Sequence, residues 1–204
     1  MKFPAKASKD FATVPAGNHV AICNAVIDLG LQPGSGMYPE PKRQVYLRFE
    51  LPTERVKYER DGKEVEGPMS IGRTLTASMS QKANLRKLIE SWFAKAFPTD
   101  DAAADFDLEN LLGRKCLLNV THTEKGEKVY ANVSNATPIP KGMPVDYAQH
   151  NQSLFYSLDE PDEKVYQALP EWLRKKIDGR LEEEVVETSP RENAREEFGD
   201  DIPF

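Results

Sequence analysis

The sequence lacks any hydrophobic run long enough to cross a membrane, since no stretch approaches 18 apolar residues. Its first ten residues, MKFPAKASKD, hold no apolar segment of the kind that a secretory signal needs. Cysteine is scarce, and Cys23 and Cys116 lie 93 positions apart without a neighbouring His or Cys, which excludes a disulfide framework and a CxxC-type zinc site. We therefore expect a protein of the cytoplasm with two small, buried thiols and no contact with membranes.

Residues suited to enzyme chemistry are also few. His19, His122 and His150 are isolated, with no second ligand or nucleophile at motif spacing. The loop GLQPGSG lacks the Lys and Ser/Thr of a phosphate-binding loop. A cluster of four aspartates lacks the glycine pattern of a calcium-binding loop, and we expect these side chains to be solvated: Asp100, Asp101, Asp105 and Asp107. We expect no enzyme activity, no metal and no cofactor.

Charge is distributed unevenly along the 204 residues, whose net charge is −6. Residues 181–204 hold nine acidic and two basic residues, a charge of −7, so residues 1–180 carry +1. A nearly neutral body can still present a basic face to a polyanion, although the whole chain is acidic.

Alternating apolar residues predict a mainly β fold. Between Val45 and Leu51 every second residue is apolar, which places one face in the core and leaves the face of Gln44, Tyr46, Arg48 and Glu50 in water. The expected strands are 17–29, 43–51, 69–79 and two within 115–136. A polar hairpin projects at Asp61-Gly62. Helical spacing after Ser80 predicts a helix that ends at Pro98.

This order of elements matches a five-stranded Greek-key barrel with a helix between its third and fourth strands, which is the OB-fold arrangement. The chain is expected to form three parts: an OB-fold domain over 1–150, a short helical extension over 151–180 and a flexible acidic tail over 181–204. Residues 138–158 are rich in proline and are expected to have no regular structure.

The segment 199–204 has the most specific local pattern. Two carboxylates, an isoleucine, a proline that restricts the backbone and a terminal phenylalanine suit a hydrophobic notch with a basic rim. The string DDIPF is similar to the acidic tip of bacterial single-stranded-DNA-binding proteins. That resemblance implies a segment that binds replication, recombination and repair enzymes: Asp200, Asp201, Ile202, Pro203 and Phe204.

The body carries a second resemblance. The stretches SMSQKANLRKLIESW, FDLENLLGRKCLLNV, VYANVSNATPIPKG and ALPEWLRKKI, between about residues 70 and 178, resemble in order and spacing a family of bacteriophage replication-associated proteins taken to be single-stranded-DNA binders. The resemblance implies an OB-fold core with an acidic tail. It also implies a role in phage DNA replication, recombination and repair, in the cytoplasm of a bacterial host.

Sequence-tolerant binding of a single strand needs cations along a groove and exposed aromatic rings for base stacking. Tyr46 and Arg48 offer both on the second strand, and Tyr38 lies at the tip of a Gly/Pro-rich loop. The predicted groove consists of Tyr38, Lys42, Arg43, Tyr46, Arg48, Lys57, Tyr58, Arg60, Lys63, Arg73, Lys115, Lys125, Lys128 and Tyr130. Four other aromatic residues stand at helical apolar positions and are expected in the core: Trp92, Phe93, Phe106 and Trp172.

Three functions stay open at this point. The first is a protein, monomeric or weakly dimeric, that coats single-stranded DNA without strong base preference and recruits enzymes through its tail. The second is an adaptor or inhibitor that binds no DNA and occupies the tail pocket of host replication enzymes. The third is RNA binding, because contacts to the 2′-hydroxyl, which distinguish RNA from DNA, are not visible in a sequence.

Overall fold

The computed structural model describes residues 12–182 except 37, 61 and 127. Its strands are β1 (Gly17–Gln32), β2 (Lys42–Arg60), β3 (Lys63–Thr76), β4 (Lys115–Lys125), β5 (Lys128–Thr137) and β6 (Leu154–Tyr156). Its helices are α1 (Asn84–Phe93), α2 (Asp100–Ala104), α3 (Glu163–Ala168) and α4 (Glu171–Asp178), with a 3₁₀ turn η1 (Leu108–Leu111). None of the helices within these ranges is long and apolar enough to span a membrane.

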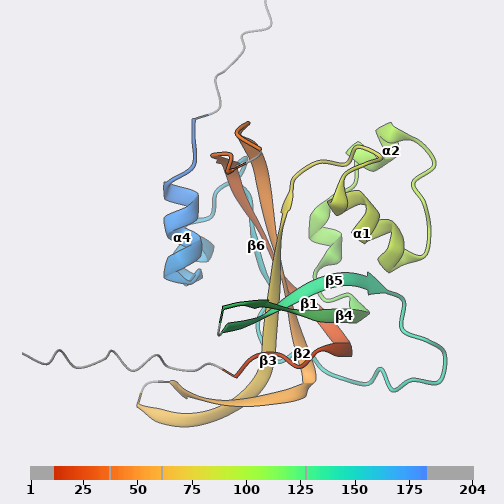
Figure 1. Ribbon diagram of the computed structural model, residues 1–204, viewed down its shortest axis with the longest axis vertical. Coiled ribbons are helices and arrows are strands. Elements are labelled where there is room, and N and C mark those ends of the chain that lie inside the picture. The colour runs from red at the N-terminus through yellow and green to blue at the C-terminus, as the bar shows by residue number, and fades with distance from the viewer. Residues whose placement is uncertain (1–11, 37, 61, 127, 183–204) are drawn as a thin grey trace, which may run out of the picture.

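The main sheet has the strand order β3-β2-β1-β4-β5, with antiparallel neighbours throughout (Figure 1). The long strand β1 pairs with β2 on one side and β4 on the other, and its register shifts at Cys23/Ala25 and Asp28/Gly30. Such bulges bend a strand and increase its twist. The sheet curls until its outer strands, β3 and β5, come into contact, so it forms a half-barrel and confirms the predicted mainly β fold.

The inner face of the half-barrel holds the larger hydrophobic core. Phe49 of β2 is fully buried, and its ring centroid lies 5.6 Å from that of Trp92 of α1. Cys23 and Cys116 are buried there as predicted, and burial raises the pKa of the Cys23 thiol to about 12. The helix that follows β3 therefore packs against the inner face of the half-barrel, and Trp92 lies in the core as predicted.

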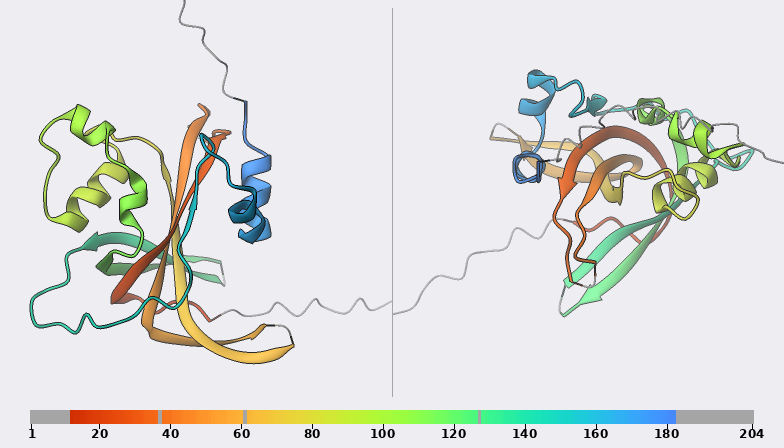
Figure 2. Two further views of the ribbon diagram at one scale, coloured as in Figure 1. Left: turned by 180° about the vertical axis from the view of Figure 1, so that it is seen from behind. Right: turned by 90° about the horizontal axis from the view of Figure 1, so that it is seen from above.

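The opposite face of β1 is covered by the C-terminal part of the described chain (Figure 2). Ile27 and Leu29 pack there against Leu173 and Ile177 of α4. The three-residue strand β6 lies within the segment expected to be irregular and pairs in parallel with Ala25–Ile27 of β1. It can do so because the β4 ladder ends at Ile22 and the last bonds on that side join Cys23 to Gly113 and Arg114, so that Ala25–Ile27 are available to β6.

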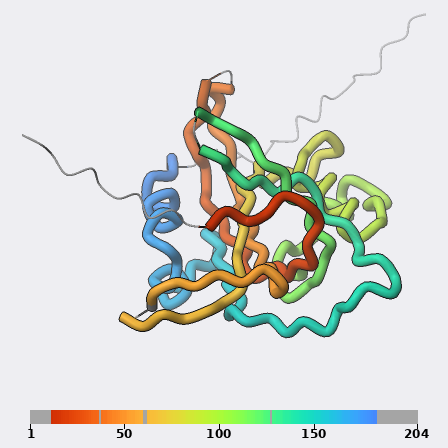
Figure 3. Tube along the Cα trace, turned by 60° about the horizontal axis from the view of Figure 1, so that its bottom comes forward, coloured from red at the N-terminus to blue at the C-terminus, as the bar shows by residue number. Residues whose placement is uncertain are grey.

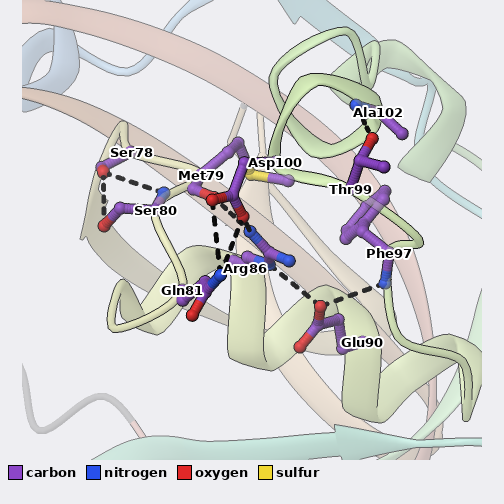
Figure 4. Close-up of polar contacts among 10 residues, drawn as sticks. All are labelled: Ser78, Met79, Ser80, Gln81, Arg86, Glu90, Phe97, Thr99, Asp100 and Ala102. Atoms are coloured by element: carbon purple, nitrogen blue, oxygen red, sulfur yellow. Dashed lines mark hydrogen bonds and ion pairs between the residues drawn. The ribbon is translucent and has the colours of Figure 1, made fainter.

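Helix α1 is shorter than predicted and is held by a buried arginine (Figure 4). It begins at Asn84 rather than after Ser80, and it ends at Ala94, whose φ of 49° is left-handed. Arg86 donates to Glu90 at 2.9 Å, to Asp100 at 2.6 Å and to the carbonyl of Met79 at 3.2 Å. These bonds lower the pKa values of Glu90 and Asp100, and they tie α1 to both flanking segments.

Candidate nucleic-acid interface

The outer face of β2, where the central part of the groove was predicted, is covered. The ring of Tyr46 lies 5.1 Å from the ring of Trp172 in an edge-on arrangement, and burial raises the pKa of the Tyr46 phenol. Arg48 is half-buried, and its Nε donates to Oδ1 of Asn24 at 2.9 Å. The expectation that this face is in water is therefore wrong, because α4 packs over it.

Glu50 on the same face is completely buried rather than wet. Its carboxylate accepts a bond from the Asn24 side chain at 3.1 Å, from the His150 backbone N–H at 2.6 Å and from the Asn151 backbone and side chain at 2.9 and 2.8 Å. Charge-assisted bonds of this number compensate the burial of a carboxylate. They fix residues 150–151, which are 100 positions away in the sequence, across the end of the predicted groove.

In and beside the loop between β1 and β2, one predicted groove residue is held by carboxylates and two are exposed. Arg43 is bound by Asp28 and Asp159, with Nη2 at 2.5 Å and 3.1 Å from their carboxylates, and these bonds raise its pKa. Tyr38 is 69 % exposed, and Nζ of Lys42 lies 5.5 Å from the centre of its ring. The loop thus presents one aromatic ring with an adjacent cation to solvent.

The projecting β2–β3 hairpin is present as predicted, with arms that are continuous with the two strands. Its charges are mostly paired: Lys57 lies 2.9 Å from Glu64, and Arg55 lies 3.1 Å from Glu66. Tyr58 packs over Gly67, and Lys63 is exposed near the tip. The side chain of Arg60 and the turn residue Asp61 lie outside the described residues. Because basic and acidic side chains are paired along both arms, we expect this hairpin to bind a polyanion more weakly than its lysines alone suggested.

Lys115 and Arg73 lie apart from the other predicted residues. Lys115 donates to the carbonyl of Val145 at 2.6 Å, under the segment that follows β5. Arg73 stands opposite Leu47 in the β2–β3 ladder, so it shares the inner face with Ile71 and Leu75. Its guanidinium reaches the line where β3 meets β5 and donates to the carbonyl of Ser134 at 2.9 Å.

The outer side of the β4–β5 hairpin is an exposed basic surface. The register pairs Lys125 with Lys128, Thr123 with Tyr130 and Thr121 with Asn132. Tyr130 is 47 % exposed, and the Thr121 hydroxyl is hydrogen-bonded to that of Ser134 at 2.8 Å. We call these seven residues the ribbon face: Thr121, Thr123, Lys125, Lys128, Tyr130, Asn132 and Ser134. It contains two cations, an aromatic ring, one amide and three aliphatic hydroxyls, and none of the seven is an acid, because alternation places Glu124 on the other side.

The ribbon and the β1–β2 loop project on the same side of the molecule in the view from above and in the tilted view (Figures 2 and 3). Tyr38 and Lys42 on the loop, and Lys125, Lys128 and Tyr130 on the β4–β5 hairpin, are predicted residues that the structure leaves exposed.

Sequence reasoning missed several residues of this surface. Trp172 was assigned to the core but is 46 % exposed beside Tyr46, so that assignment is wrong, whereas Trp92 is buried and Phe93 and Phe106 are partly buried against the core as expected. The polar residues of the ribbon face were also missed. Their signal is an alternation of uncharged polar residues with no acid, running from Thr121 and Thr123 on β4 to Asn132 on β5.

No protein-family model matches this sequence, and no curated protein sequence matches it. The function is therefore argued from the geometry of the described residues together with the sequence resemblances given above.

Proposed function

We propose that this protein binds single-stranded DNA with an OB-type barrel and acts in phage DNA replication, recombination and repair in a bacterial host cell. The strand order, with β1 paired to both β2 and β4 and α1 between β3 and β4, supports the OB-fold assignment. The observation that carries the proposal is the ribbon face, where Tyr130 stands exposed beside two lysines and, among the described residues, no carboxylate shares that face.

This surface has the chemistry that a single strand requires. Bases stack on an aromatic ring whatever their identity, and each such contact contributes about 1–3 kcal/mol. Lys125 and Lys128 would neutralise phosphates and release their counterions, so the affinity should fall steeply with salt. Because the hydroxyls and amides of the ribbon face bond to one another, as Thr121 does to Ser134, we expect little discrimination among bases.

The acidic segment 200–204 is assigned the recruiting role on its resemblance to the tip of bacterial single-stranded-DNA-binding proteins. It lies outside the described residues. Under this proposal it meets replication and repair enzymes through its two aspartates and its apolar residues, while the body holds DNA.

A titration of fluorescently labelled oligo-dT and of the matching duplex, followed by anisotropy at two salt concentrations, tests the proposal. We expect tighter binding of the single strand, weakened by salt, and a clear loss of affinity in the double variant Lys125→Ala/Lys128→Ala. The charge-matched control is Lys164→Ala/Lys176→Ala on the exposed surface of α3 and α4. Binding of neither oligonucleotide would contradict the proposal and favour the adaptor hypothesis; a preference for oligo-U would favour RNA.

A further inference from the structure

Arg73 is a half-buried cation that has no carboxylate partner among the described residues. Alternation along β3 directs it inward with Ile71 and Leu75, and desolvation by the surrounding protein lowers its pKa. Among the described residues its hydrogen-bond partner is the Ser134 carbonyl, and no acid forms an ion pair with it. Removing a charge from water is unfavourable unless an opposite charge or several hydrogen bonds compensate it, so this site favours an anion.

An open pocket of about 240 Å³, lined in part by Arg73, lies at the line where β3 and β5 meet beside α1. Its lining contains a second cation, four uncharged polar residues and one leucine, and no acid: Lys87, Asn84, Ser91, Ser134, Asn135 and Leu88. Asn135 donates its amide to the Ser91 hydroxyl at 2.9 Å, which joins β5 to α1 and holds the cavity wall in place. We call this cavity the seam pocket.

Helix α1 adds to the positive character of the seam pocket. Its N-cap residue, Ala83, has no capping side chain, and its first turn holds no acid. The first N–H groups of the helix are therefore available as donors near Asn84, and no acid of the first turn itself offsets the helix dipole. The Arg86 bonds to Glu90 and Asp100 fix this helix, so Lys87 keeps its place in the pocket wall.

We infer that the seam pocket binds a phosphate group. A guanidinium offers paired N–H donors that match phosphate oxygens, and Lys87 supplies a second charge on the facing element. Ser134 lies four residues from Tyr130 on β5, which is about 13 Å in an extended strand. A strand that stacks a base on Tyr130 and follows the ribbon face would reach the pocket with its backbone; this step rests on the proposed function, whereas the anion preference does not.

The test uses the full chain, with inorganic phosphate and oligo-dT as separate probes. In the first measurement, the thermal unfolding midpoint is followed while phosphate replaces chloride at constant ionic strength. Phosphate should raise the midpoint of the natural protein, and Arg73→Gln/Lys87→Gln should lose most of that rise. Lys82→Gln, an exposed lysine just before α1 that does not line the pocket, is the matched control and should keep it.

In the second measurement, the slope of log affinity for oligo-dT against log salt should fall by about 1.4 in the double variant, or about 0.7 for each lost phosphate contact. Lys87→Gln alone, at an exposed helix position, keeps the test valid if substitution of Arg73 prevents folding. An equal phosphate response in the double variant and in the control overturns the pocket. Oligo-dT binding that the variants leave unchanged overturns the role of the pocket in holding the DNA backbone, while the proposed function stands. A phosphate response without oligo-dT binding supports the pocket while the proposed function fails.

Discussion

The outer face of β2 and the ribbon face of β4 and β5 have similar sequence patterns and different surroundings. Each alternates apolar residues with a tyrosine and basic side chains. On β2, the partner of Tyr46 is Trp172 of α4, and Glu50 is bound by residues 150–151. On β5, Tyr130 is open and no later segment covers it within the described chain. Alternation thus identifies an outward face, but only distant segments decide whether that face meets water or protein.

The first prediction concerns the cover over β2 and has the largest expected effect. Leu173 of α4 is almost completely buried against Ile27 and Leu29. Leu173→Ala should lower the free energy of unfolding by about 2–5 kcal/mol, the usual cost of a cavity at a fully buried leucine. Urea unfolding followed by circular dichroism measures it. Leu181→Ala, at an exposed leucine, should change stability by less than about 0.5 kcal/mol; equal losses in both would show that α4 contributes little to the fold.

The second prediction compares the two tyrosines directly. Tyr130→Ala should weaken oligo-dT binding by about 1–3 kcal/mol, or roughly 5- to 150-fold, because an exposed stacking ring is lost. Tyr46→Ala should instead lower stability and leave affinity nearly unchanged, since its ring already packs on Trp172. Anisotropy and urea unfolding of both variants decide the matter. The comparison breaks if Tyr46→Ala loses affinity more than Tyr130→Ala does.

The third prediction concerns stability at low pH and helix α1, which contacts β5. Hydrogen bonds from Arg86 lower the pKa values of Glu90 and Asp100 in the folded protein. Groups with a lowered folded pKa stabilise the fold above their unfolded values, near 4, and this contribution is lost as pH falls through the folded values. Asp100→Asn should therefore reduce the dependence of unfolding free energy on pH below about 4.5. Asp101→Asn is the control, and an equal effect there would exclude the Arg86 contact as the cause.

The fourth and smallest prediction compares two lysines. Lys57 is paired with Glu64 on the β2–β3 hairpin, whereas no ion pair of Lys128 occurs among the described residues. Lys128→Ala should lower the salt slope of oligo-dT binding by about 0.7, and Lys57→Ala should leave it nearly constant. Titrations over a series of chloride concentrations measure both slopes. A larger change of the salt slope for Lys57→Ala would indicate that the DNA binds at the β2–β3 hairpin rather than at the ribbon face.

Local sequence patterns were sufficient for the mainly β fold, the order of three strands, a helix and two strands, and the two buried thiols. They succeeded because each depends on the spacing of neighbouring residues, as with Val45 to Leu51. The fate of Tyr46, Arg48 and Glu50 could not be predicted in this way. Trp172, the partner of Tyr46, and Asn151, a partner of Glu50, are more than 100 residues away, and proline-rich stretches such as 138–158 give no periodic signal of where they pack.

The position of Arg73 shows a second limit. Its type suggested a surface contact, but its ladder partner Leu47 places it on the inner side, and its guanidinium reaches the Ser134 carbonyl where β3 meets β5. The register of β2 and β3 includes an irregularity between Leu51 and Arg55, and no local sequence pattern predicts it.

The burial of the two cysteines has a practical consequence. A thiol reacts as its thiolate, and burial raises the pKa of Cys23 to about 12, so the thiol stays protonated at neutral pH. Cys116 is equally enclosed, and burial raises its pKa as well. The two cysteines of the folded protein should therefore not react with maleimides or mild oxidants. They need not be replaced before a cysteine is introduced for labelling. A dye attached to a cysteine introduced in place of Lys128 would then report from a single position on the β4–β5 hairpin.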